Sequence, residues 1–204
     1  MRLIWNGHAC FTLETAQGTL VTDPYGDGSV PGLSPVRLTA DAVYCSHGHS
    51  DHNAAQLVTL TGKDLTVSVE GLPTFHDDQK GALRGENVMR IFSAEGMRVA
   101  HLGDLGCPLT PEQKARLTGL DALLIPVGGY YTIDAAQAKA IVEELRPRVT
   151  VPMHYRGEGF GYDVISGVED FLSLCGDCVY YPGNVLELTP DTPAQTAVLT
   201  CPRP

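Results

Sequence analysis

The sequence predicts an α+β fold in which two β-sheets pack face to face and helices lie outside them. Short β-branched or aromatic runs recur along the whole chain, which is typical of many short strands. The 22 glycines and 14 prolines are scattered between these runs and predict turns rather than a disordered tract. With 43% hydrophobic residues in 204, the chain can bury one core, so we expect a single domain over residues 1–204.

The first quarter of the chain predicts a β-meander that ends beside a histidine-rich loop. Three strands are expected, at residues 2–5, 10–14 and 19–22. Gln17-Gly18 supplies the hairpin turn before the third strand, and Asp23-Pro24 ends that strand. The glycine- and proline-rich stretch 25–35 indicates a long surface loop, and residues 42–45 indicate a buried strand that leads directly into the histidines.

The middle of the chain combines a helical segment with further strands. Residues 53–60 have helical spacing, and residues 65–69 indicate a strand. Two later runs, 88–92 and 98–102, are expected to pair as a hairpin across the turn Glu95-Gly96.

Helices and strands alternate in the second half of the chain. Residues 111–117 predict a helix, because Thr110 is a natural N-cap and Pro111 suits the first helical position. The strongest helical segment is 134–145, rich in Ala, Glu and Lys, with Thr132 or Asp134 near its start and Pro147 to stop it. The remaining expected elements are a helix at 168–175 and strands at 122–125, 149–151, 185–188 and 197–200.

A dense group of candidate metal ligands follows the strand expected at residues 42–45. The segment reads His47-Gly48-His49-Ser50-Asp51-His52, which places three imidazoles and a carboxylate within six positions. Such a cluster is rare by chance, and imidazole nitrogen with carboxylate oxygen is a donor set that suits Zn²⁺. The pattern predicts a metal site at the end of a strand.

Three more candidate ligands lie far along the chain, each after an apolar run and before a turn. They are His76, Asp104 and His154. In an extended loop His47 and His49 point the same way, whereas Asp51 and His52 can turn toward a second ion. Two ions held close together need a bridging anion, which a carboxylate such as Asp104 and a hydroxide supply. Seven ligands suffice for two metals.

The order of these motifs resembles that of the metallo-β-lactamase superfamily. The family pattern of H-x-H-x-D-H, a lone His, a bridging Asp and a last His is matched over most of the chain. The short length, the opening Gly7-His8-Ala9-Cys10-Phe11 and the segment Val21-Thr22-Asp23-Pro24 resemble the small branch that includes the ascorbate-phosphate lactonase. The resemblance implies an αββα sandwich of two mixed sheets with the metals at one edge.

The resemblance also implies how the ligands are shared between two ions. One ion would be held by His47, His49 and His76. The other would be held by Asp51, His52 and His154, with Asp104 between the two. His76 is the least secure of these, because its neighbours Asp77 and Asp78 offer carboxylates of their own.

These residues predict a metal-dependent hydrolase with a dinuclear site, most simply two Zn²⁺ ions, with Mn²⁺ and iron as the other candidates. A bridging hydroxide would attack a small ester, lactone or phosphoester, and Asp51 or Asp104 would carry the proton to the leaving group. Two alternatives stay open: a di-iron redox protein, and a metal-binding protein without turnover. The sequence does not define the substrate or the oligomeric state.

Composition excludes several classes of partner. The formal net charge of −10 repels phosphate backbones and anionic lipid, so we expect neither nucleic-acid nor membrane binding. The N-terminus lacks the apolar stretch of a signal peptide, and no run is long enough to cross a bilayer. We expect a cytoplasmic protein whose partner is a small molecule, either neutral or anionic.

Several polar residues near the motifs have open roles. His8 fits equally well a plain turn residue and a residue that hydrogen-bonds the substrate or a metal ligand. Asp23 is expected to orient a histidine that binds the metal. His101 is expected to be buried rather than ligating, and Cys175 and Cys178 to be reduced thiols rather than half a zinc site. Loop residues that an anionic substrate could contact are Arg84, Asn87, Tyr130, Tyr131, Tyr155 and Arg156.

Overall fold

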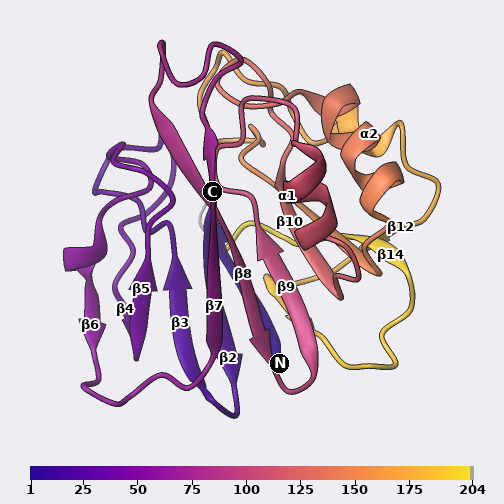
Figure 1. Cartoon of the computed structure of the whole chain (residues 1–204). Helices are drawn as coiled ribbons and strands as arrows, with labels where there is room; N and C mark the ends of the chain where they lie inside the picture. The colour runs from indigo at the N-terminus through magenta and orange to yellow at the C-terminus, as the bar shows by residue number, and fades with distance from the viewer. Residues whose placement is uncertain (203–204) are drawn as a thin grey trace.

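Two β-sheets form the centre of the molecule, in a computed structural model that describes residues 1–202 (Figure 1). The first sheet has the strand order β13-β1-β2-β3-β5. Its strands are β1 (Arg2–Gly7), β2 (Cys10–Thr15), β3 (Gly18–Thr22), β5 (Ala42–Tyr44) and β13 (Val185–Glu187). All neighbours are antiparallel except β3 and β5, which are parallel. The expected N-terminal meander is confirmed.

The second sheet has seven strands in the order β12-β14-β11-β10-β9-β8-β7. They are β7 (Ser68–Phe75), β8 (Glu86–Ala94), β9 (Met97–His101), β10 (Ala122–Pro126), β11 (Val149–Met153), β12 (Cys178–Tyr180) and β14 (Gln195–Val198). Strands β7, β8 and β9 pair in antiparallel fashion, and the neighbouring strands β9, β10, β11, β14 and β12 pair in parallel. The hairpin expected across Glu95-Gly96 is confirmed, whereas the strand expected at 65–69 begins only at Ser68 and continues to Phe75.

The helix expected at residues 53–60 is wrong. The structure has one 3₁₀ turn, η1 (Ala55–Leu57), followed directly by strand β6 (Val58–Leu60). This strand pairs in parallel with β4 (Leu38–Ala40), which the sequence did not predict. Its backbone groups are satisfied by a partner about twenty residues away, and that pairing outweighs the weak helical pattern.

Two helices carry the capping chemistry that the sequence indicates. In α1 (Pro111–Arg116) the Thr110 side chain caps the first turn, and in α2 (Ala135–Leu145) Asp134 does the same. The third helix, α3 (Glu169–Leu172), is much shorter than the expected 168–175, because it has no side-chain cap and the chain soon enters β12. Within residues 1–202, no helix is both long and apolar enough to span a bilayer.

Side-chain alternation separates two apolar layers on the first sheet. Phe11 and Leu20 belong to the main core, which lies between the two sheets and includes Met89 of β8. Cys10 and Val21, the adjacent positions, face the other way and pack with the loop that follows β3. Its residues Tyr25 and Val30 are each only 1% exposed, so the loop expected on the surface instead covers this sheet. The αββα-type sandwich of two packed sheets is confirmed.

Strand direction brings distant loops to one edge of the sandwich. In the first sheet β1, β3 and β5 run the same way, and in the second β7, β9 and β11 do. The carboxyl ends of these six strands are followed in order by six polar residues: His8, Asp23, His47, His76, Asp104 and His154. Each strand therefore delivers one polar group to the loops beyond its carboxyl end, the usual place for a ligand site in such sheets.

Candidate metal centre

The structure brings all seven expected ligands into one cluster. Three overlapping groups have donor atoms within 4.8 Å of one another. They are His47 with His49 and His76; His47 with His52 and Asp104; and His8 with Asp51, His52 and His154. The first group comprises the three imidazoles that the resemblance assigned to one ion, and the last contains the three residues assigned to the other. His8, whose role the sequence left open, joins the last group.

Asp104 occupies the centre of this cluster. Its Oδ2 lies 3.2 Å from Nε2 of each of three imidazoles, those of His52, His76 and His154. His47 Nε2 is slightly farther, at 3.9 Å. Because Asp104 is 1% exposed, its carboxylate depends on these neighbours rather than on water for compensation. The residue touches imidazoles from both proposed ligand sets.

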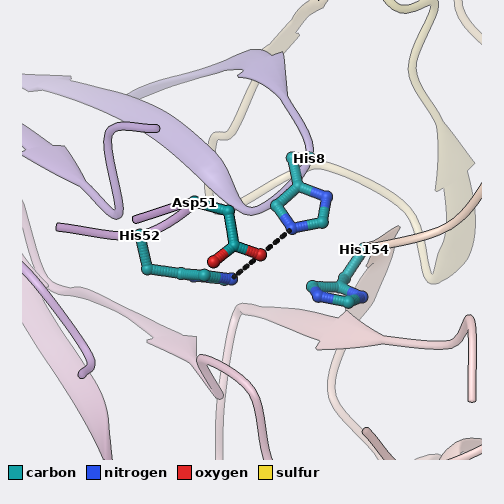
Figure 2. Close-up of side chains that lie close together, drawn as sticks. All are labelled: His8, Asp51, His52 and His154. Carbon is teal, nitrogen blue, oxygen red and sulfur yellow. Dashed lines mark ion pairs between the residues drawn. The ribbon is translucent and has the colours of Figure 1, made fainter. Parts of the chain in front are cut away.

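Figure 2 shows the end of the cluster built around Asp51. The Asp51 carboxylate oxygen Oδ2 lies 3.3 Å from His8 Nε2 and 3.6 Å from His52 Nε2. The imidazole of His154 lies beside that of His8, with 4.1 Å between ring centroids. A residue from the turn between β1 and β2 thus meets residues that come from β5 and β11.

Burial and neighbouring charges together set the protonation of the cluster. Burial, with a smaller contribution from His154, lowers the pKa of His8 to about 4. Burial likewise lowers the pKa of His47 to about 4, helped by His52. Neutral imidazole is the form that binds a metal. Burial alone would raise the pKa of Asp104, but the surrounding imidazoles outweigh it and hold that pKa well below its usual range.

Unsatisfied polar atoms gather in this cluster. Buried side-chain nitrogens and oxygens normally have hydrogen-bond partners. Here several have none of good geometry: His8 Nδ1 and Nε2, His52 Nε2, His76 Nδ1, Asp104 Oδ1, and His154 Nδ1 and Nε2. Nitrogen and oxygen donors of this kind match a borderline divalent cation. The residues present therefore fit a bound metal, which would occupy the lone pairs that the chain itself leaves without partners.

One buried carboxylate orients imidazoles at both ends of the cluster. Asp23 Oδ2 accepts hydrogen bonds from His52 Nδ1 at 2.9 Å and from the Ser46 hydroxyl at 2.6 Å. Since the Ser46 proton is used for Asp23, its oxygen accepts from His47 Nδ1, 2.9 Å away. Each imidazole thus uses Nδ1 as a donor and turns Nε2 toward Asp104 Oδ2, 3.2 Å away for His52 and 3.9 Å away for His47. The hydrogen bond through which Asp23 was expected to orient a histidine is present, at His52.

Backbone strain is concentrated in the same loops. His8, Asp23 and His154 all have left-handed backbone conformations, with φ of 52°, 43° and 53°. Non-glycine residues reach this region at an energetic cost, which the surrounding packing must offset. Gly103 also lies here: a Cβ on it would come within 2.3 Å of Asn87 Oδ1, the atom that accepts from the Asp104 N–H at 3.0 Å. The loop before Asp104 has no room for a side chain.

A sequence model of the β-lactamase superfamily domain matches residues 2–154, a span that contains every member of the cluster. The chain belongs to the metallo-β-lactamase superfamily. It is 30% identical over 193 residues to a UPF0173 metal-dependent hydrolase of Opitutus terrae, with 76% of this chain and 85% of the relative covered. A UPF0173 metal-dependent hydrolase of Archaeoglobus fulgidus is 28% identical over 194 residues, covering 76% and 83%.

Solved structures of the superfamily share the fold. A Thermotoga maritima member, proposed to be a zinc-dependent hydrolase, has a TM-score of 0.77 and 34% identity and covers 97% of each chain. A metallo hydrolase of Ignicoccus hospitalis has a TM-score of 0.64 at 21% identity and covers 92% of this chain and 99% of that chain. The narrower likeness to the ascorbate-phosphate lactonase branch stays a prediction.

Four residues that the sequence left as alternatives do not join the cluster. His101 is buried, donates from Nε2 to the Ala9 carbonyl at 2.8 Å and accepts the Gly103 N–H on Nδ1, as expected of a histidine that does not ligate. Cys175 and Cys178 form no disulfide in the structure and belong to none of the donor groups. Asp77, considered as a substitute for His76, instead directs its carboxylate at four backbone N–H groups.

An open cavity of about 340 Å³ adjoins the cluster. Its lining comprises His49, Ser50, Asp51, His76, Arg84, Asp104, Tyr131, His154 and Tyr162. Of the loop residues that the sequence offered for substrate contact, only Arg84 and Tyr131 are in this described lining. Tyr162 was missed: its hydroxyl lies 3.2 Å from Asp51 Oδ2 and 2.7 Å from the Ser29 carbonyl. No motif marks Tyr162, because only folding brings it to Asp51.

Proposed function

We propose that this metal-dependent hydrolase of the metallo-β-lactamase superfamily holds two zinc ions beside the 340 Å³ cavity and hydrolyses a small ester, lactone or phosphoester. The observation that supports this most directly is the position of Asp104, whose Oδ2 lies within 3.2 Å of three imidazoles. A single carboxylate placed so can contribute to two ions at once. Two bound divalent ions would supply a water of lowered pKa and a Lewis acid for the developing oxyanion.

The two proposed ligand sets follow the donor groups of the structure. The first consists of three imidazoles, those of His47, His49 and His76. The second consists of His8, Asp51, His52 and His154. We add His8 because both its ring nitrogens are buried and lack a hydrogen bond, which is costly unless a ligand occupies one of them.

The two carboxylates suit different roles. Asp104 is fully buried among imidazoles and stays ionised. Its negative charge therefore lies between the two sets, where it would compensate the positive charge of both ions. The Asp51 side chain is 15% exposed and lines the cavity, next to the Tyr162 hydroxyl. Asp51 is the more exposed of the two carboxylates and is better placed to move a proton to a leaving group, so we assign that step to Asp51.

Hydrolysis is tested by offering the zinc-loaded protein a lactone, a carboxylic ester and a phosphodiester. We expect at least one of the three classes to be turned over, and turnover to vanish when the zinc is removed. Binding of two zinc ions without turnover of any class would favour the non-catalytic alternative. An iron absorption spectrum in protein as purified, with no hydrolysis, would favour the redox one.

Asp23 and Ser46 provide a graded test of the two ligand sets. Replacing Asp23 by alanine removes the acceptor that orients His52 directly and His47 through Ser46. We expect the affinity for both ions to fall about 10- to 100-fold, the usual cost of losing such a partner. Ser46→Ala should weaken only the ion held by His47. A competition titration with a chromogenic chelator measures both affinities.

The control for this test is Asp41→Ala. Like Asp23, which accepts the Ser46 N–H at 2.6 Å, Asp41 accepts a backbone N–H, that of Thr19 at 2.8 Å. Asp41 belongs to none of the donor groups. Its replacement should leave both zinc affinities unchanged. Equal zinc affinities in Asp23→Ala and the native protein would contradict the orienting role.

A further inference from the structure

Arg84 differs from every other arginine that the structure describes. Within residues 1–202, the other eight arginine side chains each donate to a carboxylate or to a backbone carbonyl. The Arg84 guanidinium has neither kind of partner in the described chain. Within the described chain it contacts the ring of Tyr131, with 5.7 Å between the guanidinium carbon and the ring centroid. A guanidinium with neither a carboxylate nor a carbonyl as acceptor keeps its N–H donors for a ligand.

This unpaired cation lines the cavity beside the metal cluster. Among the described lining residues, Arg84 is the one side chain that is permanently positive. Tyr131 and Tyr162 connect it to the other end of the cavity, since their ring centroids are 5.8 Å apart and Tyr162 reaches Asp51. A small molecule that contacts the cluster at Asp51 can therefore also reach the guanidinium.

The loop that carries Arg84 is held rigidly next to a proposed ligand. The Asp77 carboxylate accepts the backbone N–H groups of Gln79, Gly81, Leu83 and Arg84, at 2.8, 2.9, 3.0 and 2.7 Å. The adjacent His76 N–H donates to the Gly85 carbonyl at 3.1 Å. The loop is thus closed on both sides of Arg84, so the position of the Arg84 backbone relative to His76 is fixed before any ligand binds.

We propose that Arg84 binds an anionic group of the substrate, a carboxylate or a phosphate, while the bond to be hydrolysed lies at the metal cluster. This inference rests on the proposed hydrolase function and narrows its substrate to small anionic molecules. The guanidinium offers a planar set of donors that matches a carboxylate or phosphate in a bidentate manner. The Tyr131 ring contributes a cation–π contact, which occupies none of the N–H donors that an anion would use.

The test compares two esters that differ only at the far end of the acyl chain. The 4-nitrophenyl ester of butanoic acid is neutral, and the 4-nitrophenyl hemiester of succinic acid ends in a carboxylate. We expect Arg84→Gln to raise KM for the hemiester by about tenfold or more. KM for the butanoate and kcat for both esters should change by less than about twofold, since Arg84 is not part of the cluster.

Lys80→Gln is the matched control. Lys80 lies in the same loop and its replacement removes the same charge, but it is exposed and outside the cavity. It should leave both KM values unchanged, which separates a local contact from the loss of net charge. Equal losses for both esters in Arg84→Gln would show a structural role for Arg84 and overturn the proposal.

A binding measurement decides the same point without catalysis. Isothermal titration of the zinc-loaded protein with succinate, and separately with glycerol 3-phosphate, distinguishes a carboxylate from a phosphate as the preferred anion. Arg84→Gln should weaken at least one of the two about tenfold, and Lys80→Gln neither. If no ester is hydrolysed but this loss is seen, the proposed hydrolysis fails and the anion site stands. Unchanged binding of both anions overturns the site.

Discussion

Replacing Asp104 by alanine is expected to abolish turnover and to release at least one of the two metal ions that we propose. The Asp104 carboxylate lies within 3.2 Å of imidazoles from both proposed sets, so its loss would remove an acidic donor from each proposed ion. It also leaves a group of buried imidazoles without a compensating charge. We expect turnover to fall by about 10³-fold or more. This is a larger loss than the roughly 10- to 100-fold decrease expected when only an orienting partner is removed. Steady-state kinetics and elemental analysis measure the two effects.

Two companion variants make this result interpretable. Asp104→Asn keeps the shape of the side chain but not its charge, so it should lose metal as well while it keeps the native circular dichroism spectrum. Asp78→Ala removes an exposed acid two residues after His76 that belongs to none of the donor groups, and it should keep both activity and metal. An Asp104→Ala protein that is active and fully loaded would contradict the bridging role.

Removal of the metal should inactivate the protein and also lower its melting temperature. The buried nitrogens and oxygens without partners lose the ligand that satisfies them, so the free energy of unfolding should decrease. An ion present at 100 times its dissociation constant stabilises the native state by about 2.7 kcal/mol, and two such ions contribute about twice that. Dialysis against a chelator followed by calorimetry measures the change.

Stepwise return of zinc distinguishes one site from two. Activity and melting temperature should both recover, and the recovery should be complete only at two zinc ions per chain. As a control, the same chelator should not affect a protein that lacks Asp104 and one ligand of each set, such as Asp104→Ala combined with His47→Ala and His52→Ala. Full recovery at one ion per chain would rule out the dinuclear site.

Local sequence signals predicted the parts of the fold that depend on local chemistry. The meander, the hairpin across Glu95-Gly96 and the capped helices α1 and α2 follow from turn residues, alternation and N-caps. Where a strand depends on a distant partner, the same signals fail. Residues 58–60 look helical in isolation but pair with β4, and the short strands β4 and β12 carry no pattern strong enough to predict them.

The sequence by itself determined the chemistry of the candidate site. The six-residue histidine motif and the three later residues after strands are readable as imidazoles and carboxylates with metal-ligand character. Their family likeness suggested how they divide between two ions. What the residues could not show is which groups around them face inward, because that depends on strands that are remote in the chain.

Only the tertiary structure showed that His8 belongs to the cluster, that Asp23 contacts Ser46 as well as His52, and that the Arg84 guanidinium lacks a hydrogen-bond acceptor. His8 meets Asp51 because β1 and β5 run in the same direction within one sheet, and it meets His154 because β11 of the facing sheet ends at the same edge. Asp23 reaches both His52 and Ser46 for the same reason. Side-chain identity is written locally, whereas strand direction and sheet packing are long-range properties, and they determine which identities come into contact.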